Sequence, residues 1–309
     1  MTHSSTLPAT LQPLRGVRVL SLALNLPGPA ALMRLRSMGA TCLKAEPPPP
    51  RGAAPGTSGD PMGHYNPTAY ATLHEGIKVV SWDLKSESGQ AALHEELART
   101  DVLLTSFRPS ALEKLGLAWP TLRARHPLLS VVAIVGARGE RAEEPGHDLT
   151  YLADAGLVNG LELPATLFAD MGGALMASEA VLSAALAQKT TGEGSFQEVA
   201  LADAAHWLAL PRTWGLTQPK GAVGGAHAGY RVFACRDGRV AVAALEPHFA
   251  AALCQAAAVP MQGPATCFEP ATHEAIAQFL QRHTCAELDA LASGRDIPMH
   301  TMPAVPQQG

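Results

Sequence analysis

Short β-prone runs alternate with helical segments through the first two thirds of this chain. Most of these runs are nearly continuous in apolar residues, and six are expected to form strands: residues 17–22, 41–45, 77–83, 101–105, 129–135 and 196–200. Strands that are apolar along their whole length are typical of a parallel sheet covered by helices on both faces. The alternation therefore predicts an α/β fold whose large domain is Rossmann-like, with a mostly parallel sheet.

The turn after the first strand has an unusual composition for such a fold. Asn25-Leu-Pro-Gly-Pro stands where a dinucleotide-binding protein would carry Gly-x-Gly-x-x-Gly, so the usual mode of dinucleotide binding is disfavoured. Pro29 suits the first turn of a helix expected over residues 30–38. Residues 47–63 are rich in Pro, Gly and Ala, which predicts a loop.

The pattern changes after residue 220. Asp237-Gly238 lies between the β-prone runs 230–235 and 239–244, which predicts a hairpin with a type I′ turn. Residues 299–304 are expected to form an edge strand. The predicted domains are residues 1–220 for the large domain, 221–292 for a smaller α+β domain, and 293–309 for a shortened C-terminal segment.

Composition excludes several classes of protein. The net charge is −4 and Lys and Arg form no block, which argues against a nucleic-acid partner. The five cysteines lack metal-binding spacing, so we expect reduced thiols and no metal site. No window of 18 apolar residues occurs, and the N-terminus lacks the features of a signal peptide. The sequence predicts a soluble, cytoplasmic protein with no membrane partner and with a loose N-terminal segment.

Two residues that can carry a proton lie in the stretch from 146 to 173. These are His147 and Asp170, and each is followed by apolar residues that could place it in a packed interior. Each also has a plainer interpretation, since Asp is a preferred helix N-cap and a single His is usually a hydrogen-bonded core or surface residue. Glu246, just before Pro247, suits a helix N-terminus in the same way.

Several segments resemble family III CoA-transferases of the CaiB/BaiF type. They are Leu14-Arg-Gly-Val-Arg-Val-Leu, Pro27-Gly-Pro, Met38-Gly-Ala, Lys44-Ala-Glu-Pro, Trp82-Asp-Leu-Lys-Ser, Thr100-Asp-Val-Leu-Leu-Thr-Ser-Phe-Arg-Pro, Gly146-His-Asp and Ala169-Asp-Met-Gly-Gly. Gly146-His147-Asp148 with Tyr151, and Leu245-Glu246-Pro247-His248-Phe249, are most similar to the α-methylacyl-CoA racemase branch.

This resemblance implies a CoA thioester as substrate, no prosthetic group, a CoA-binding large domain and an interlocked homodimer. It implies that His147, tuned by Glu246, and Asp170 move protons on opposite faces of carbon 2 of a 2-methylacyl-CoA. Backbone amides at Gly172-Gly173 would approach the thioester oxygen. The residues expected to contact CoA are Arg108, Asp148, Tyr151 and Lys78, although Arg108 could instead anchor a loop, Tyr151 could pack, and Lys78 could be a solvated charge.

Two other functions stay open. In a CoA-transferase, Asp170 alone would attack the thioester and carry CoA as an aspartyl thioester. A catalytically silent CoA-binding or dimerisation partner would use none of the three residues for catalysis. The presence of both His147 and Glu246 favours proton transfer, because a transferase needs neither.

Overall fold

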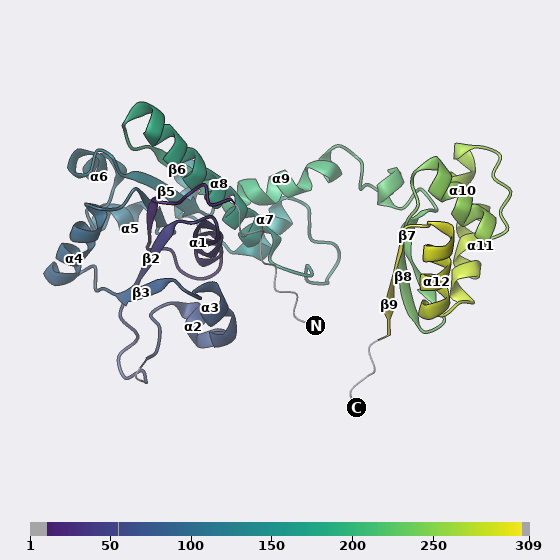
Figure 1. The fold of residues 1–309 in the computed structure, drawn as a ribbon, viewed down its shortest axis with the longest axis horizontal. Helices are drawn as coiled ribbons and strands as arrows, with labels where there is room; N and C mark the ends of the chain where they lie inside the picture. Colours follow the sequence, from purple (N-terminus) through teal and green to yellow (C-terminus); the bar gives the residue numbers. More distant parts are fainter. Residues whose placement is uncertain (1–10, 55, 305–309) are drawn as a thin grey trace. The chain divides into compact units, whose positions relative to one another are not determined.

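The structure is a computed structural model that describes residues 11–54 and 56–304. The N-terminal segment expected to be loose and the last five residues of the predicted C-terminal segment lie outside these ranges. The chain divides into two compact units, one ending at Ala209 and the other beginning at Leu210 (Figure 1).

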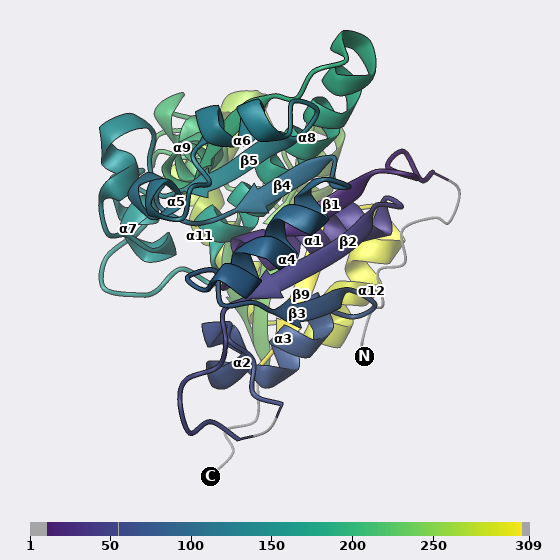
Figure 2. The ribbon, with the colours of Figure 1, turned by 90° about the vertical axis from the view of Figure 1, so that its left-hand side faces the viewer.

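The first unit is built on a six-stranded parallel sheet with the order β3-β2-β1-β4-β5-β6 (Figure 2). Each strand falls within a segment predicted from the sequence or extends one residue beyond it, which confirms the α/β fold. The strands are β1 (Arg18–Ser21), β2 (Thr41–Glu46), β3 (Lys78–Ser81), β4 (Val102–Thr105), β5 (Ser130–Val135) and β6 (Phe196–Ala200).

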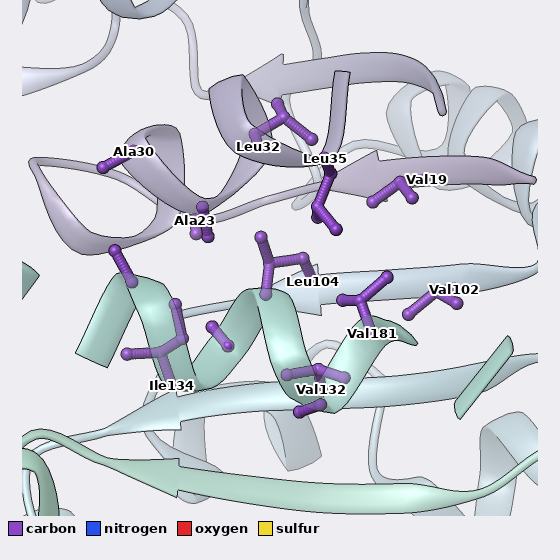
Figure 3. Packing of buried hydrophobic residues seen from close by; sticks show 14 of the residues in the cluster. Val19, Ala23, Ala30, Leu32, Leu35, Val102, Leu104, Val132, Ile134 and Val181 are labelled. Atoms are coloured by element: carbon purple, nitrogen blue, oxygen red, sulfur yellow. The ribbon is translucent and has the colours of Figure 1, made fainter. Parts of the chain in front are cut away.

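Helices cover both faces of this sheet. They are α1 (Pro27–Ser37), α2 (Pro61–Tyr65), α3 (Pro67–Leu73), α4 (Glu87–Leu97), α5 (Pro109–Lys114), α6 (Trp119–Arg125), α7 (Asp148–Asp154), α8 (Phe168–Thr191) and α9 (Leu201–Thr213), with a 3-10 helix at Gly139–Glu143. On one face, strand residues pack against α1 and α8, as Leu35, Leu104, Val132 and Val181 illustrate (Figure 3). Neighbouring strand residues such as Leu103 point to the other face and pack against α4, α5 and α6. Burial on both faces explains the nearly continuous apolar strands.

The helices α2 and α3 lie in a region where the sequence analysis predicted none. Each begins with a polar residue followed by proline, Asp60-Pro61 and Asn66-Pro67. The Asp60 side chain accepts a hydrogen bond from Met62 N, and Asn66 accepts one from Ala69 N. Both starts follow the usual rules for helix N-termini, but the apolar pattern of such short helices is too brief to detect.

The second unit has an antiparallel sheet of β7 (Tyr230–Cys235), β8 (Gly238–Ala243) and β9 (Met299–Pro303), in that order. Its helices are α10 (Pro247–Ala256), α11 (Pro270–Gln281) and α12 (Cys285–Arg295), with 3-10 helices at Ala222–Gly224 and Pro264–Phe268. The hairpin and the edge strand are confirmed. No described helix in either unit is long and apolar enough to cross a membrane.

The predicted type I′ turn of the hairpin is wrong. Neither Arg236 nor Asp237, the two residues between the strands, has a positive φ. Both are held by the segment that leads into α12: Arg236 N donates to His283 O at 2.8 Å, and the Asp237 carboxylate accepts from Cys285 N at 2.7 Å. These contacts outweigh the local preference of Asp-Gly for a left-handed turn.

Candidate active site

A cavity of about 170 Å³ opens at the carboxyl ends of β1, β4 and β5 in the first unit. In the strand order, β2 lies on one side of β1 and β4 lies on the other, so the order of the strands reverses beside β1. Ligands of open α/β sheets bind at such a switch point in strand order. The cavity is lined by Leu24, Asn25, Pro27, Ser106, Phe107, Arg108, Ile134, Val135, Gly136, Ala142, Glu144, Gly146, His147, Tyr151, Asp170 and Leu201.

Asp170 lies in the first turn of α8 and lines the cavity. It does not cap the helix, because Leu167 occupies the N-cap position. Its backbone N–H donates to the carboxylate of Asp148, the first residue of α7, at 3.0 Å. Burial, and then the nearby charge of Asp148, raise the pKa of the Asp170 carboxyl to about 6, while His147 acts in the opposite direction. Asp170 can therefore gain or lose a proton near neutral pH.

His147 occupies the N-cap position of α7 and is exposed at the same cavity. Its backbone N–H donates to the Thr150 hydroxyl at 3.1 Å, and that hydroxyl donates back to the His147 carbonyl at 2.7 Å. Both bonds use the main chain, so they fix the start of α7 independently of the imidazole. The structure thus brings two of the three predicted catalytic residues to one cavity.

Tyr151 and Arg108 also line the cavity. A Cβ added at Gly146 would lie 2.5 Å from the Tyr151 hydroxyl, so the glycine before His147 is required for the tyrosine ring to pack there. Burial and the charge of Asp170 raise the pKa of Tyr151, and the positive charge of Arg108 opposes this. Arg108 is exposed at the N-cap of α5, where its guanidinium is available to an anionic ligand.

The other predicted residues lie elsewhere. Asp148 is buried behind Asp170 and does not line the cavity. Lys78 is exposed at the amino end of the edge strand β3, whereas the cavity lies at carboxyl ends of strands. Glu246 is exposed at the N-cap of α10 in the second unit, and its side chain makes no cap hydrogen bond there.

The glycine pair after Asp170 is used for packing. A Cβ on Gly173 would collide with Leu201, and one on Gly172 would lie 3.3 Å from both Ala204 and Leu208. All three neighbours belong to α9, so the glycines allow α8 and α9 to lie close together. Neither glycine lines the cavity.

The comparison with protein-family models decides the family. The model of CoA-transferase family III matches residues 14–307. The chain belongs to this family. It is 33% identical over 205 residues to the cinnamoyl-CoA:phenyllactate CoA-transferase of Clostridium sporogenes, covering 62% of this chain and 50% of that one. It is 30% identical over 258 residues to the mouse α-methylacyl-CoA racemase, covering 78% and 63%.

Solved structures agree on the fold. The Mycobacterium tuberculosis protein Rv3272 matches with a TM-score of 0.77 and 24% identity, covering 96% of this chain and 87% of that chain. A CaiB/BaiF family protein from Brucella suis matches with a TM-score of 0.72 and 21% identity, covering 96% and 85%. The chain spans about half the length of the first curated transferases that it matches, 52% and 50%.

A second, mostly apolar cavity of about 140 Å³ lies beside the first in this family III chain. Phe107 lines both cavities, and Trp82 and Lys85 follow the end of β3. In the sequence, Trp82-Asp-Leu-Lys-Ser is a segment that resembles the family, with no role predicted for Trp82. The position of these residues directly after a parallel strand was the signal that could have found them, because such positions meet at one edge of the sheet.

Two cysteines that are distant in the sequence meet in the second unit. The Cys235 and Cys285 sulfurs lie 3.6 Å apart, and the ligand atoms of both residues and of Asp237 all lie within 4.8 Å of one another. Three donors could in principle hold a soft metal ion. However, the Asp237 carboxylate already accepts from Cys285 N, and burial raises the pKa of the Cys285 thiol to about 12. The cluster therefore anchors the start of α12.

Proposed function

We propose that this chain is an acyl-CoA racemase that inverts carbon 2 of 2-methylacyl-CoA thioesters. The observation that supports it is that His147 and Asp170 line one cavity and that the pKa of Asp170 is raised to about 6. Inversion needs one group that removes a proton and a second that delivers one to the opposite face. A carboxyl group that titrates near neutral pH can serve in either role.

The reaction balances without a redox step. One of the two residues takes the proton from carbon 2, the electron pair of that C–H bond forms a double bond to the thioester carbon, and the carbonyl π pair moves to the oxygen to give an enolate. The other residue then protonates carbon 2 from the opposite face, and the thioester carbonyl is restored. The positive charge of Arg108 at the cavity rim favours the anionic intermediate and the phosphates of CoA.

The second cavity is suited to the nucleotide part of CoA. Its lining includes the aromatic rings of Trp82 and Phe107, which offer surfaces for stacking an adenine, and the Lys85 ammonium. Phe107 joins it to the first cavity, so a ligand could extend from one to the other. We therefore place the adenine beside Trp82 and the acyl group beside Asp170.

We further propose a homodimer that brings Glu246 to His147. Large apolar side chains of the first unit are exposed, among them Leu161, Leu163 and Trp207 at 102%, 76% and 69%. Burial of such side chains against a partner chain would stabilise a dimer. Co-expressing Asp170→Asn with Glu246→Gln tests this. If each site takes Asp170 from one protomer and Glu246 from its partner, mixed dimers regain activity that neither variant has alone.

Proton exchange at carbon 2 is the decisive test of the racemase proposal. A single enantiomer of 2-methylacyl-CoA, incubated with the protein in D2O, should gain deuterium at carbon 2 as it racemises. Mass spectrometry and chiral analysis follow the two processes together. Absence of deuterium from a folded protein that binds the thioester would contradict the proposal.

CoA transfer is the second candidate, since the cinnamoyl-CoA:phenyllactate CoA-transferase matches the chain at 33% identity and the mouse racemase at 30%. In that reaction the Asp170 carboxylate would attack the thioester carbonyl and release the CoA thiolate, which leaves a mixed anhydride. The thiolate would then attack the Asp170 carbonyl of this anhydride, form the aspartyl thioester and release the acyl group as a free carboxylate. Hydroxylamine trapping distinguishes the two. A hydroxamate at Asp170 supports transfer, whereas deuterium exchange without a hydroxamate supports racemisation.

A further inference from the structure

The segment between β1 and α1 is held by side chains from three directions. Ala23 N donates to the Ser21 hydroxyl at 3.2 Å, Leu24 N donates to the Ser106 hydroxyl at 3.1 Å, and Asn25 N donates to both oxygens of Asp60 at 3.1 and 3.2 Å. Three consecutive backbone donors are thus fixed where the segment forms part of the cavity wall. Backbone that is fixed in this way can hold a side chain in a defined position relative to a bound ligand.

Asn25 has a left-handed backbone, with φ +63°. This conformation is costly for most residues, and Asn tolerates it better than others. Its acceptor, Asp60, is fully buried and is itself held by the fully buried Lys44 ammonium, whose Nζ lies 2.5 Å from Asp60 Oδ2. A buried ion pair therefore keeps Asn25 in a conformation that the residue would not adopt by default.

The side chain of Asn25 is available for a ligand. Within residues 11–54 and 56–304, no hydrogen bond to its carboxamide is present, and the residue is half-buried at the cavity. An enolate needs a hydrogen-bond donor at its oxygen, and Gly172 and Gly173 lie outside the cavity lining. Among the cavity-lining residues, Asn25 offers a neutral amide donor.

We propose that the Asn25 carboxamide donates a hydrogen bond to the thioester oxygen of the bound acyl-CoA, and that Asp60 is the positioning residue that sets Asn25 for this contact. This inference rests on the proposed function, because it names the oxygen whose negative charge grows during proton removal. The hydrogen bond forms with the carbonyl and shortens as the enolate develops, so it lowers the barrier.

Two substitutions at Asn25 separate its carboxamide from its backbone. Asn25→Gly removes the amide and accepts a positive φ without strain, and Asn25→Asp keeps the size but replaces the donor with a negative acceptor. We expect Asn25→Gly to slow deuterium exchange on the order of 100-fold, and Asn25→Asp to slow it further. The affinity for free CoA should be unchanged in both, because free CoA has no thioester oxygen.

A binding experiment tests the inference without catalysis. Calorimetry would compare a nitronate analogue of the acyl-CoA, whose anionic oxygen stands for the enolate oxygen, with an alkyl-CoA thioether, which lacks that oxygen. We expect Asn25→Gly to weaken the nitronate by roughly 10- to 100-fold and to leave the thioether unaffected. Equal affinity of wild type and Asn25→Gly for the nitronate would overturn the inference, even if wild type racemises its substrate.

The same comparison tests Asp60. We expect Asp60→Asn to weaken the nitronate in wild type but to have little further effect in Asn25→Gly, because Asp60 acts through Asn25. An additive loss in the double variant would assign Asp60 a separate role. If wild type shows no exchange with 2-methylacyl-CoA but still prefers the nitronate through Asn25, the racemase proposal fails and the inference stands.

Discussion

Two groups of charged residues in the first unit are built in opposite ways. One is the buried network around Lys44, with Glu46 and Asp60, and the other is the cavity that contains His147 and Asp170. Both use short-range electrostatics, and both lie near the carboxyl ends of strands. They differ in whether each charge has a partner within the protein.

The Lys44 network is fully paired. The ammonium lies 3.0 Å from Glu46 Oε1, 2.5 Å from Asp60 Oδ2 and 2.9 Å from His74 Nε2. Because His74 Nδ1 lies 2.6 Å from the Tyr70 carbonyl, Nδ1 carries the proton and Nε2 accepts from Lys44. Burial, and then the Lys44 charge, lower the pKa of His74, which agrees with a neutral ring.

Glu46 shows the same completeness. Burial alone would raise its pKa, but hydrogen bonds from the Ser58 and Tyr70 hydroxyls and the charge of Lys44 together lower it. In the part of the chain that the structure describes, no hydrogen bond to the Asp170 carboxylate is present, and its pKa is raised. Glu46 and Asp60, whose carboxylates are paired with Lys44, hold the backbone around them in place. A carboxyl group that lacks such partners can instead exchange protons.

The largest effect should come from removing the Asp170 carboxyl, which we propose moves the proton. We expect Asp170→Asn to reduce deuterium exchange at carbon 2 by roughly 10²–10⁴-fold, because asparagine cannot accept or deliver a proton under these conditions. The rate of label incorporation measures this. Asp154→Asn, an exposed carboxylate on α7, is the matched control and should keep the wild-type rate. A rate for Asp170→Asn within a few-fold of wild type would contradict the assignment.

Breaking the paired network should instead affect stability. Lys44→Met keeps the shape of the side chain but leaves two buried carboxylates without their cation, so we expect a loss of about 3–5 kcal/mol in the free energy of unfolding. Urea denaturation measures it. Arg123→Met, which removes an exposed pair with Glu193, serves as the control and should leave the midpoint almost unchanged. A small effect at Lys44 would show that the network is dispensable.

Asp170 should reduce the stability of the protein at neutral pH. Its pKa rises from 3.8 in the unfolded chain to about 6, so the folded state binds more protons between these values and stability falls as pH rises. Asp170→Asn should therefore be more stable than wild type by about 1–3 kcal/mol near neutral pH. The difference should shrink as pH falls toward 3.8 and vanish at about pH 3, because both states are then protonated. Urea denaturation across this range measures the difference, and a variant that is less stable at every pH would contradict the assigned pKa.

The sequence was sufficient for those parts of the fold that depend on local pattern. The six parallel strands and the hairpin follow from runs of apolar and β-branched residues. The choice of His147 and Asp170 as candidate site residues follows from family motifs. The type I′ turn failed because Asp237 is held by Cys285, 48 residues away. The local preference of Asp-Gly for a type I′ turn is weaker than this tertiary hydrogen bond.

The chemistry of the site depended on contacts that no local pattern contains. Nothing in the sequence near Asn25 shows that Asp60 holds its backbone, or that Asp148 lies behind Asp170. The raised pKa of Asp170 is a property of that burial and of the charge of Asp148, so it could not be read from residue types. The position of Glu246 in the assembled protein likewise remains part of the proposal.

The smallest predicted effect is the sharpest test of how Asp170 is tuned. Asp148→Asn keeps an oxygen that can accept from Asp170 N but removes the negative charge that raises the pKa of Asp170. The pKa should fall below about 6, by less than the full displacement from 3.8, because burial remains the larger cause. The substrate should be the enantiomer for which Asp170 is the base. In a plot of its exchange rate against pH, the rise on the acidic side should move to lower pH, because Asp170 of the variant loses its proton at a lower pH. If that rise stays where it is or moves to higher pH, Asp148 only holds the start of α8. Burial alone would then account for the difference in pKa between Asp170 and the paired carboxylates around Lys44.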